Sequence, residues 1–203
     1  MCEWRNGHAQ VYIPEKNYIF CIGGSYAPKT CEYYEVAEDE WGSGPELTLG
    51  IQAGTGCYSG THVYYFGGLT REDDEDADNV YRPVTYMERL NFAEFKQWEV
   101  VDVKCEGKTP LNSMWVGAGM INESQMLIFG GMLTEKAEGG EGAGDTEDAF
   151  FFDVNTHTFS DATPMKREIR MDNTDEVKLI NGKLYAIGEV DFEIMLSIYN
   201  VDE

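Results

Sequence analysis

The side chains that could perform catalysis or bind a metal are few and widely separated in this sequence. Its three histidines, His8, His62 and His157, lie in different parts of the 203-residue chain, and nothing in the sequence brings two of them together. Five cysteines form no Cys-x-x-Cys pair, which favours a reducing compartment over a disulfide framework. Nucleophile elbows, phosphate-binding glycine loops and the His-Glu-x-x-His pattern are absent. We therefore expect a protein that is not an enzyme and that uses no cofactor.

Acidic residues gather in two stretches, residues 69–84 and 132–148, which together hold 12 of the 37 acids. These acids are Glu72, Asp73, Asp74, Glu75, Asp76, Asp78, Glu135, Glu138, Glu141, Asp145, Glu147 and Asp148. The stretches are either solvated insertions or a negative surface that binds a basic segment of a partner protein. Asp74, Asp76 and Asp78 also match the first half of an EF-hand loop. They predict weak calcium binding at most, because Thr85 stands in the place of the closing glutamate.

The overall composition narrows the class of protein. Acids outnumber Lys and Arg by 37 to 15, and the resulting net charge of -22 repels nucleic acid and anionic membranes. Apolar residues make up 42% of the chain, which is enough for a folded core. No apolar run approaches the roughly 20 residues that span a bilayer, and the first residues lack the pattern of a signal peptide. We expect a cytoplasmic, globular protein whose partners are proteins.

A repeated apolar run that ends in two glycines predicts the fold. The runs cover residues 18–22, 63–66, 126–129 and, in a degenerate copy, 184–187. They precede Gly23-Gly24, Gly67-Gly68, Gly130-Gly131 and Gly188-Glu189, whose first glycines are 44, 63 and 58 residues apart. This spacing is typical of four-stranded propeller blades with insertions, and the continuously apolar runs indicate sheets buried on both faces. Glycine permits positive φ where the run ends, and its missing Cβ would let a neighbouring aromatic ring approach the backbone.

Pairs of large side chains follow the doublets at similar spacings. These are Tyr34 and Trp41, then Leu90 and Trp98, then Phe152 and Phe159, whereas Tyr199 in the last copy has no following aromatic. A strand precedes each apolar run, at residues 8–13, 53–58, 116–121 and 176–180. Each unit is thus predicted to have four strands, a to d from the inside outward. The single propeller region of residues 1–203 divides into repeats of about 5–48, 49–107, 108–164 and 165–203.

These residues resemble the kelch repeat. The match covers nearly the whole chain and rests on the double glycines, the paired aromatics and the tetrad Arg5-x-Gly7-His8 before the first strand. This tetrad is absent from the other repeats. The resemblance implies an all-β kelch-type propeller or partial propeller with four recognisable four-stranded repeats, the last one truncated. It also implies a protein-interaction module or scaffold, with cytoskeletal or axonemal complexes among the possible settings.

Enzymes with this resemblance offer an alternative function, a small-molecule enzyme of the mutarotase or lyase type. Nitrile-specifier-like members of the family bind iron through Glu-x-x-x-Asp-x-x-x-His. In this sequence Asp153 and His157 have that spacing, but Ala149 occupies the glutamate position.

The predicted fold also places the candidate binding residues. In antiparallel blades the b–c and d–a loops lie at the same end of the propeller, so we expect partners to bind there. The candidate residues on this loop face are Tyr26, Lys29, Asp73, Asp74, Asp76, Asp78, Tyr81, Arg82, Glu138, Glu141 and Asp145.

Four repeats allow three ways of completing the ring. The chain is part of a longer propeller, is completed by another chain, or closes on itself with residues Cys2–Trp4 as the last strand. A blade buries its apolar faces only against neighbouring blades. An incomplete ring therefore predicts an isolated chain that is unstable, self-associates or belongs to a larger assembly.

Overall fold

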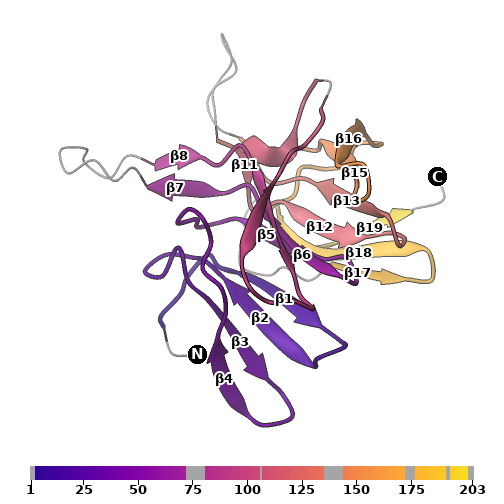
Figure 1. Ribbon diagram of the computed structural model, residues 1–203. Coiled ribbons are helices and arrows are strands. Elements are labelled where there is room, and N and C mark those ends of the chain that lie inside the picture. The colour runs from indigo at the N-terminus through magenta and orange to yellow at the C-terminus, as the bar shows by residue number, and fades with distance from the viewer. Residues whose placement is uncertain are drawn as a thin grey trace.

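The computed structural model describes residues 3–71, 81–105, 107–134, 144–171, 177–190 and 193–200. In these residues the protein is built from four small antiparallel sheets, and its one helical element is the 3-10 turn η1 (Pro110–Asn112). The sheets are the blades of a four-bladed β-propeller (Figure 1), which confirms the predicted all-β fold.

The first two blades have four strands each, in the sequence order from the axis outward. Blade 1 consists of β1 (Ala9–Ile13), β2 (Tyr18–Ile22), β3 (Cys31–Glu35) and β4 (Glu40–Ser43). Blade 2 consists of β5 (Thr55–Tyr58), β6 (His62–Phe66), β9 (Met87–Asn91) and β10 (Trp98–Val101). Between β6 and β9, where the sequence predicts a loop, β7 (Leu69–Arg71) and β8 (Tyr81–Pro83) form a separate ribbon.

Blades 3 and 4 differ in their number of strands. Blade 3 consists of β12 (Gly117–Met120), β13 (Gln125–Phe129), β15 (Ala149–Asp153) and β16 (Thr158–Asp161). Blade 4 consists of β17 (Val177–Ile180), β18 (Lys183–Val190) and β19 (Glu193–Asn200), without a fourth strand among the described residues. A short pair, β11 (Ser113–Met114) and β14 (Met132–Leu133), precedes and follows the inner strands of blade 3.

The double glycines attach each blade to the next. At Gly23, Gly67 and Gly130 φ is 60°, 67° and 63°, and an added Cβ would lie 2.4–2.5 Å from a backbone carbonyl oxygen of the segment that enters the next blade. The N–H of the following glycine donates to that same carbonyl in all three blades, over 2.7–2.9 Å. These carbonyls belong to Ile51, Ser113 and Ile169. A carbonyl therefore takes the place that we had expected an aromatic ring to take, although at Gly23 the Tyr65 hydroxyl would also lie 3.0 Å from the added Cβ.

The fourth glycine does not repeat this arrangement. β18 runs on through Gly188 to Val190, paired with β19 along its whole length. The prediction that strand b of the last repeat ends at Gly188-Glu189 is therefore wrong. A Cβ at Gly188 would meet the Arg170 carbonyl at 2.5 Å, so this glycine serves close packing against the segment that enters its own blade.

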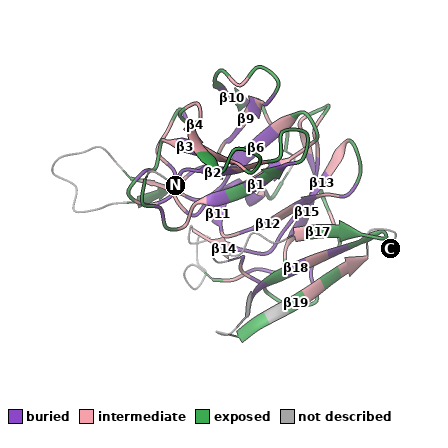
Figure 2. Cartoon of the chain, turned by 90° about the horizontal axis from the view of Figure 1, so that it is seen from below, coloured by how far each residue is buried: buried purple, intermediate pink, exposed green. Residues whose placement is uncertain are grey.

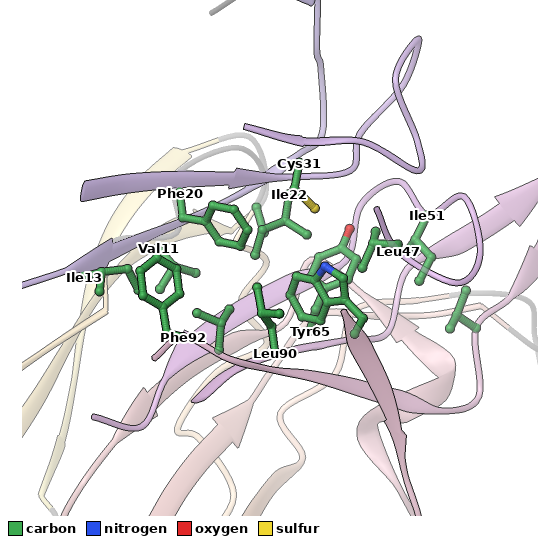
Figure 3. Close-up of a cluster of buried hydrophobic side chains, with 14 residues drawn as sticks. Val11, Ile13, Phe20, Ile22, Cys31, Leu47, Ile51, Tyr65, Leu90 and Phe92 are labelled. Carbon is green, nitrogen blue, oxygen red and sulfur yellow. The ribbon is translucent and has the colours of Figure 1, made fainter. Parts of the chain in front are cut away.

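Apolar side chains fill the three interfaces between successive blades. Figure 3 shows the first interface, where Val11 and Phe20 of blade 1 face Leu90 and Phe92 of blade 2. A second cluster joins blades 2 and 3, and a third joins blades 3 and 4. Among the described residues, no comparable cluster joins blade 4 to blade 1.

Blade 4 and blade 1 consequently each have one face that no neighbouring blade covers. The outward face of blade 4 exposes Ile194 by 82%, Leu196 by 58% and Ile198 by 51%, and in Figure 2 its strands carry exposed residues. On the opposite end, Tyr12 of blade 1 is 50% exposed. Trp4 is 85% exposed, and Glu3 accepts hydrogen bonds from Arg5 and Thr30 beside blade 1. Thus Glu3 and Trp4 do not supply the last strand of blade 4, and that suggested closure is wrong.

Candidate interaction surface

A buried arginine organises the b–c loop of blade 1, residues 23–30. The Arg5 side chain is 0% exposed and forms an ion pair of 3.0 Å with Glu32 on β3. Its Nη1 donates to the carbonyls of Gly23, Ala27 and Thr30 over 2.8–3.1 Å. Its Nη2 donates to the Thr30 hydroxyl at 2.7 Å. The planar guanidinium thus fixes both ends and the middle of one loop, a use for which lysine lacks the geometry.

This loop presents Tyr26 to solvent. Tyr26 is 83% exposed and adopts the left-handed conformation, with φ of 72°. A non-glycine residue seldom adopts this conformation unless the surrounding structure imposes it. Ala27 is 7% exposed and its carbonyl accepts from Arg5, so the residue after Tyr26 is anchored. Lys29 is exposed in the same loop. Two of the predicted residues therefore share a preorganised loop.

The β7–β8 ribbon carries two further predicted residues. Arg71 pairs with Tyr81 and Thr70 with Arg82 in its register. Tyr81 is 44% exposed, and Arg82 is exposed as well. In Figure 1 the ribbon projects from the blades at the end that holds the b–c loops. The predicted residues Tyr81 and Arg82 thus lie on an extension of the loop face, away from the propeller axis.

The mouth of the axis on the loop face holds a cluster that the sequence analysis missed. Trp115, two residues before β12, adopts φ of 55°, and the Arg170 guanidinium lies 5.9 Å from its ring centroid. Arg170 also pairs with Asp145 at 3.4 Å. Asp145, a predicted binding acid, is therefore engaged with a cation of its own chain. A spacing of 55 residues between Trp115 and Arg170 gave no signal that they would meet.

Backbone hydrogen bonds position this mouth. The Ala53 N–H donates to Gly7, Trp115 to Ala53 and Met171 to Trp115, over 2.8–3.1 Å. Gly7, Ala53 and Trp115 each lie two residues before an inner strand, and Met171 lies in the segment between β16 and β17, so these bonds tie the four blades in series around the axis. Gly7, Ala53 and Trp115 all have positive φ.

Most of the predicted acidic residues lie outside the described part of the chain. They are Asp73, Asp74, Asp76, Asp78, Glu138 and Glu141. Asp148, which is described, forms an ion pair of 3.0 Å with Lys108. Within the described ranges, no group of three or more His, Cys, Asp or Glu residues is arranged to hold a metal ion. The weak calcium prediction at Asp74, Asp76 and Asp78 falls on residues that the structure does not describe.

Arg89 of blade 2 contacts His157 of blade 3, and its charge also acts on His62, so two histidines that the sequence did not connect share a neighbour. His157 Nε2 is 3.2 Å from Arg89 Nη1, and the His157 ring stacks on Phe152. Burial and then Arg89 lower the pKa of both His62 and His157, and His157 lowers the pKa of His62 further. Asp153 accepts backbone hydrogen bonds from the β15–β16 turn, so the Asp153–His157 spacing here serves hairpin structure.

The thiols fall into two groups. Burial raises the pKa of Cys21 to about 11 and those of Cys31 and Cys57 to about 12. Cys105, by contrast, is exposed, although partial burial and the nearby Asp161 still raise the pKa of its thiol. The four described cysteines are all free.

A groove of about 780 Å³ runs along the axis between the inner strands. Gly56–Tyr58, Ala118–Met120 and Val177–Lys178 line it together with residues of β1, and it extends to Pro14 in the β1–β2 turn. The groove therefore reaches the end of the propeller opposite the loop face. None of the helices in the described ranges is long and apolar enough to cross a membrane.

No family model matches the chain, and no curated protein matches it either. The propeller architecture itself thus comes from the structure.

Proposed function

We propose that the protein is a non-catalytic, intracellular protein-interaction module of the kelch type. The observation that carries the proposal is the loop built around Arg5, which displays Tyr26 in a fixed and exposed position. Tyrosine is enriched among the residues that dominate binding energy at protein interfaces, because it offers a large contact area with few rotatable bonds. A preorganised loop avoids part of the entropy cost of ordering on binding.

The charge of the chain suggests the chemistry of the partner. With a net charge of -22, the protein attracts a basic segment at long range, and complementary charges raise association rates. Tyr26 then serves as the anchor, and Tyr81 and Arg82 on the ribbon extend the contact. Because the chain would hold one protein while belonging to a larger assembly, we propose a scaffold role, with cytoskeletal complexes as one setting.

The test compares two exposed tyrosines. Wild-type protein, Tyr26→Ala and Tyr12→Ala are used as bait in cell extract, and the captured partner is then purified and titrated calorimetrically. Tyr12 lies on β1, outside the b–c and d–a loops, and is a matched control. We expect Tyr26→Ala to weaken binding at least about tenfold and Tyr12→Ala to leave it unchanged. Equal binding by all three proteins would refute the role of the loop face.

The axial groove favours a second candidate, the small-molecule kelch enzyme. Its volume of about 780 Å³ lies within the range of roughly 300–1,000 Å³ that small-molecule sites occupy. Lys178 and Tyr58 are among the polar side chains along it. Turnover of a small molecule that is lost in Lys178→Met and Tyr58→Phe, but kept in Tyr26→Ala, would favour this alternative.

A further inference from the structure

The outer edge of blade 4 differs from that of every other blade. Blades 1 to 3 each end in a fourth strand, whereas the described part of blade 4 ends at β19. Beside this edge lies a pocket of about 340 Å³. It is lined by residues 163–167, which follow β16, and by Leu196–Asn200 of β19.

The three complete blades show which side chain occupies the equivalent place. In each, an aromatic residue on the fourth strand pairs with a large side chain on the third. The pairs are Tyr34 with Trp41, Leu90 with Trp98, and Phe152 with Phe159. Leu90 in turn pairs with Val63 on strand b, and in blade 4 the corresponding pair is Leu184 with Tyr199. Tyr199 therefore occupies the position opposite which an aromatic residue sits in every other blade.

Trp98 shows how such an aromatic residue is held. It is 4% exposed, its ring stacks on Phe20 of the preceding blade, and its Nε1 donates to the Pro45 carbonyl at 3.1 Å. Pro45 lies in the segment that leaves β4, the last strand of that preceding blade. For blade 4 the equivalent segment leaves β16 and contains Pro164, and both Pro164 and Tyr199 line the pocket.

We propose that the edge of β19 binds an extended segment of a partner protein as the fourth strand of blade 4, with an aromatic side chain of that segment in the pocket beside Tyr199 and Pro164. Backbone hydrogen bonds to the sheet edge supply affinity, and the pocket supplies specificity, as in other cases of strand addition. This site lies on the edge of the last blade and does not depend on the Tyr26 loop.

Charge defines the partner segment further. Lys166 and Arg167 are exposed and line the pocket in a protein that is otherwise strongly acidic. Two of the chain's three fourth strands place an acid next to the aromatic residue, in Glu40-Trp41 and Trp98-Glu99. The bound segment therefore carries an acidic residue next to its aromatic one.

A peptide with the sequence of residues 95–103, Phe-Lys-Gln-Trp-Glu-Val-Val-Asp-Val, is a suitable probe because it contains the Trp98 strand. Fluorescein-labelled peptide is titrated with the 203-residue protein and followed by anisotropy. We expect saturable binding that falls at least about tenfold when the peptide tryptophan is replaced by alanine. Hydrogen exchange should slow at the amides of β19 when the peptide is bound.

Protein variants locate the site. Tyr199→Ala should weaken binding about tenfold, whereas Tyr185→Ala, on the other face of the same sheet, should leave it unchanged. Because Tyr199→Ala also removes packing, Lys166→Glu with Arg167→Glu provides a second test at two exposed positions, and it should weaken binding as well. The proposal would be overturned if replacing the peptide tryptophan by alanine left the affinity unchanged, or if the bound peptide did not slow hydrogen exchange at the amides of β19. If the protein alone sediments as a dimer that the peptide dissociates, a second copy occupies the edge and the partner-protein assignment is wrong.

Discussion

Replacement of Arg5 by alanine tests how much the buried Arg5 side chain stabilises the fold. The Arg5 guanidinium is fully buried and compensates the Glu32 carboxylate, whose side chain is 5% exposed, while it donates to three loop carbonyls. Breaking a buried ion pair by removing one partner costs about 3–5 kcal/mol, because the remaining charge stays buried. A domain is stable by only about 5–15 kcal/mol. We therefore expect Arg5→Ala to lower the free energy of unfolding by about 3–5 kcal/mol.

The assay is urea unfolding at pH 7, followed by tryptophan fluorescence and circular dichroism. Arg5→Lys keeps the charge but loses the planar fork of donors, so it should recover only part of the loss. Replacing both partners, Arg5→Met with Glu32→Leu, should recover stability further because no buried charge remains. Even with its stability recovered, the double variant should bind the Tyr26 partner more weakly than the wild type, because the loop carbonyls lose their common donor. A loss below about 1 kcal/mol for Arg5→Ala would refute the reasoning.

Three more predictions follow from backbone geometry, titration and thiol burial. Gly130→Ala should destabilise by about 2–4 kcal/mol in urea unfolding, because its Cβ would lie 2.4 Å from a carbonyl oxygen at φ of 63°. Gly60→Ala, with φ of 89° and open space around it, should cost only about 1–2 kcal/mol, and equal losses would contradict the carbonyl argument. The pKa values of His62 and His157 are lowered from 6.5, so the unfolded chain binds more protons below that pH, and stability should be full above pH 6.5 and fall as the pH drops. Thermal melts between pH 8 and 5 should show this fall, and the double variant His62→Gln with His157→Gln should show a smaller fall. If the double variant loses stability with pH as steeply as the wild type, these two histidines are not its cause. In a Cys2→Ser background, Cys105 should react with a thiol reagent before any other cysteine under native conditions because it alone of the described thiols is exposed, even though its pKa is raised. Labelling of Cys21, Cys31 or Cys57 at the same rate would contradict the structure, in which these thiols are buried.

The sequence predicted the blades because their periodic signals are local. An apolar run and a double glycine fall within seven residues, and steric limits on φ require glycine at that turn whatever the surroundings. The three doublets at Gly23, Gly67 and Gly130 all form the predicted turn. The fourth copy misled because Gly188 has the right spacing, while the extended pairing of β18 with β19 sets its conformation.

The candidate site was less predictable because its contacts join distant residues. Tyr26 could be placed in a loop from the repeat alone, but its rigid presentation depends on Arg5, 21 positions earlier in the chain. His157 of blade 3 contacts Arg89 of blade 2 only because these two blades stack. The residue types of Trp115 and Arg170 do not recur at the equivalent positions of the other repeats, so no pattern singled them out. Physical contact across blades depends on packing that a single sequence does not display.

The pairing just outside the double glycines has a consequence for how this chain can evolve. Gln52 and Leu69 exchange backbone hydrogen bonds at the base of one long loop, and Ser113–Met114 pairs with Met132–Leu133 at the base of another. These backbone pairs hold the base of each loop together, so the geometry of the blades does not depend on the length or sequence of the rest of the loop. Doubling a flexible loop costs only about 0.6 kcal/mol in closure entropy. The two loops can therefore change in length and charge during evolution while the propeller keeps its geometry.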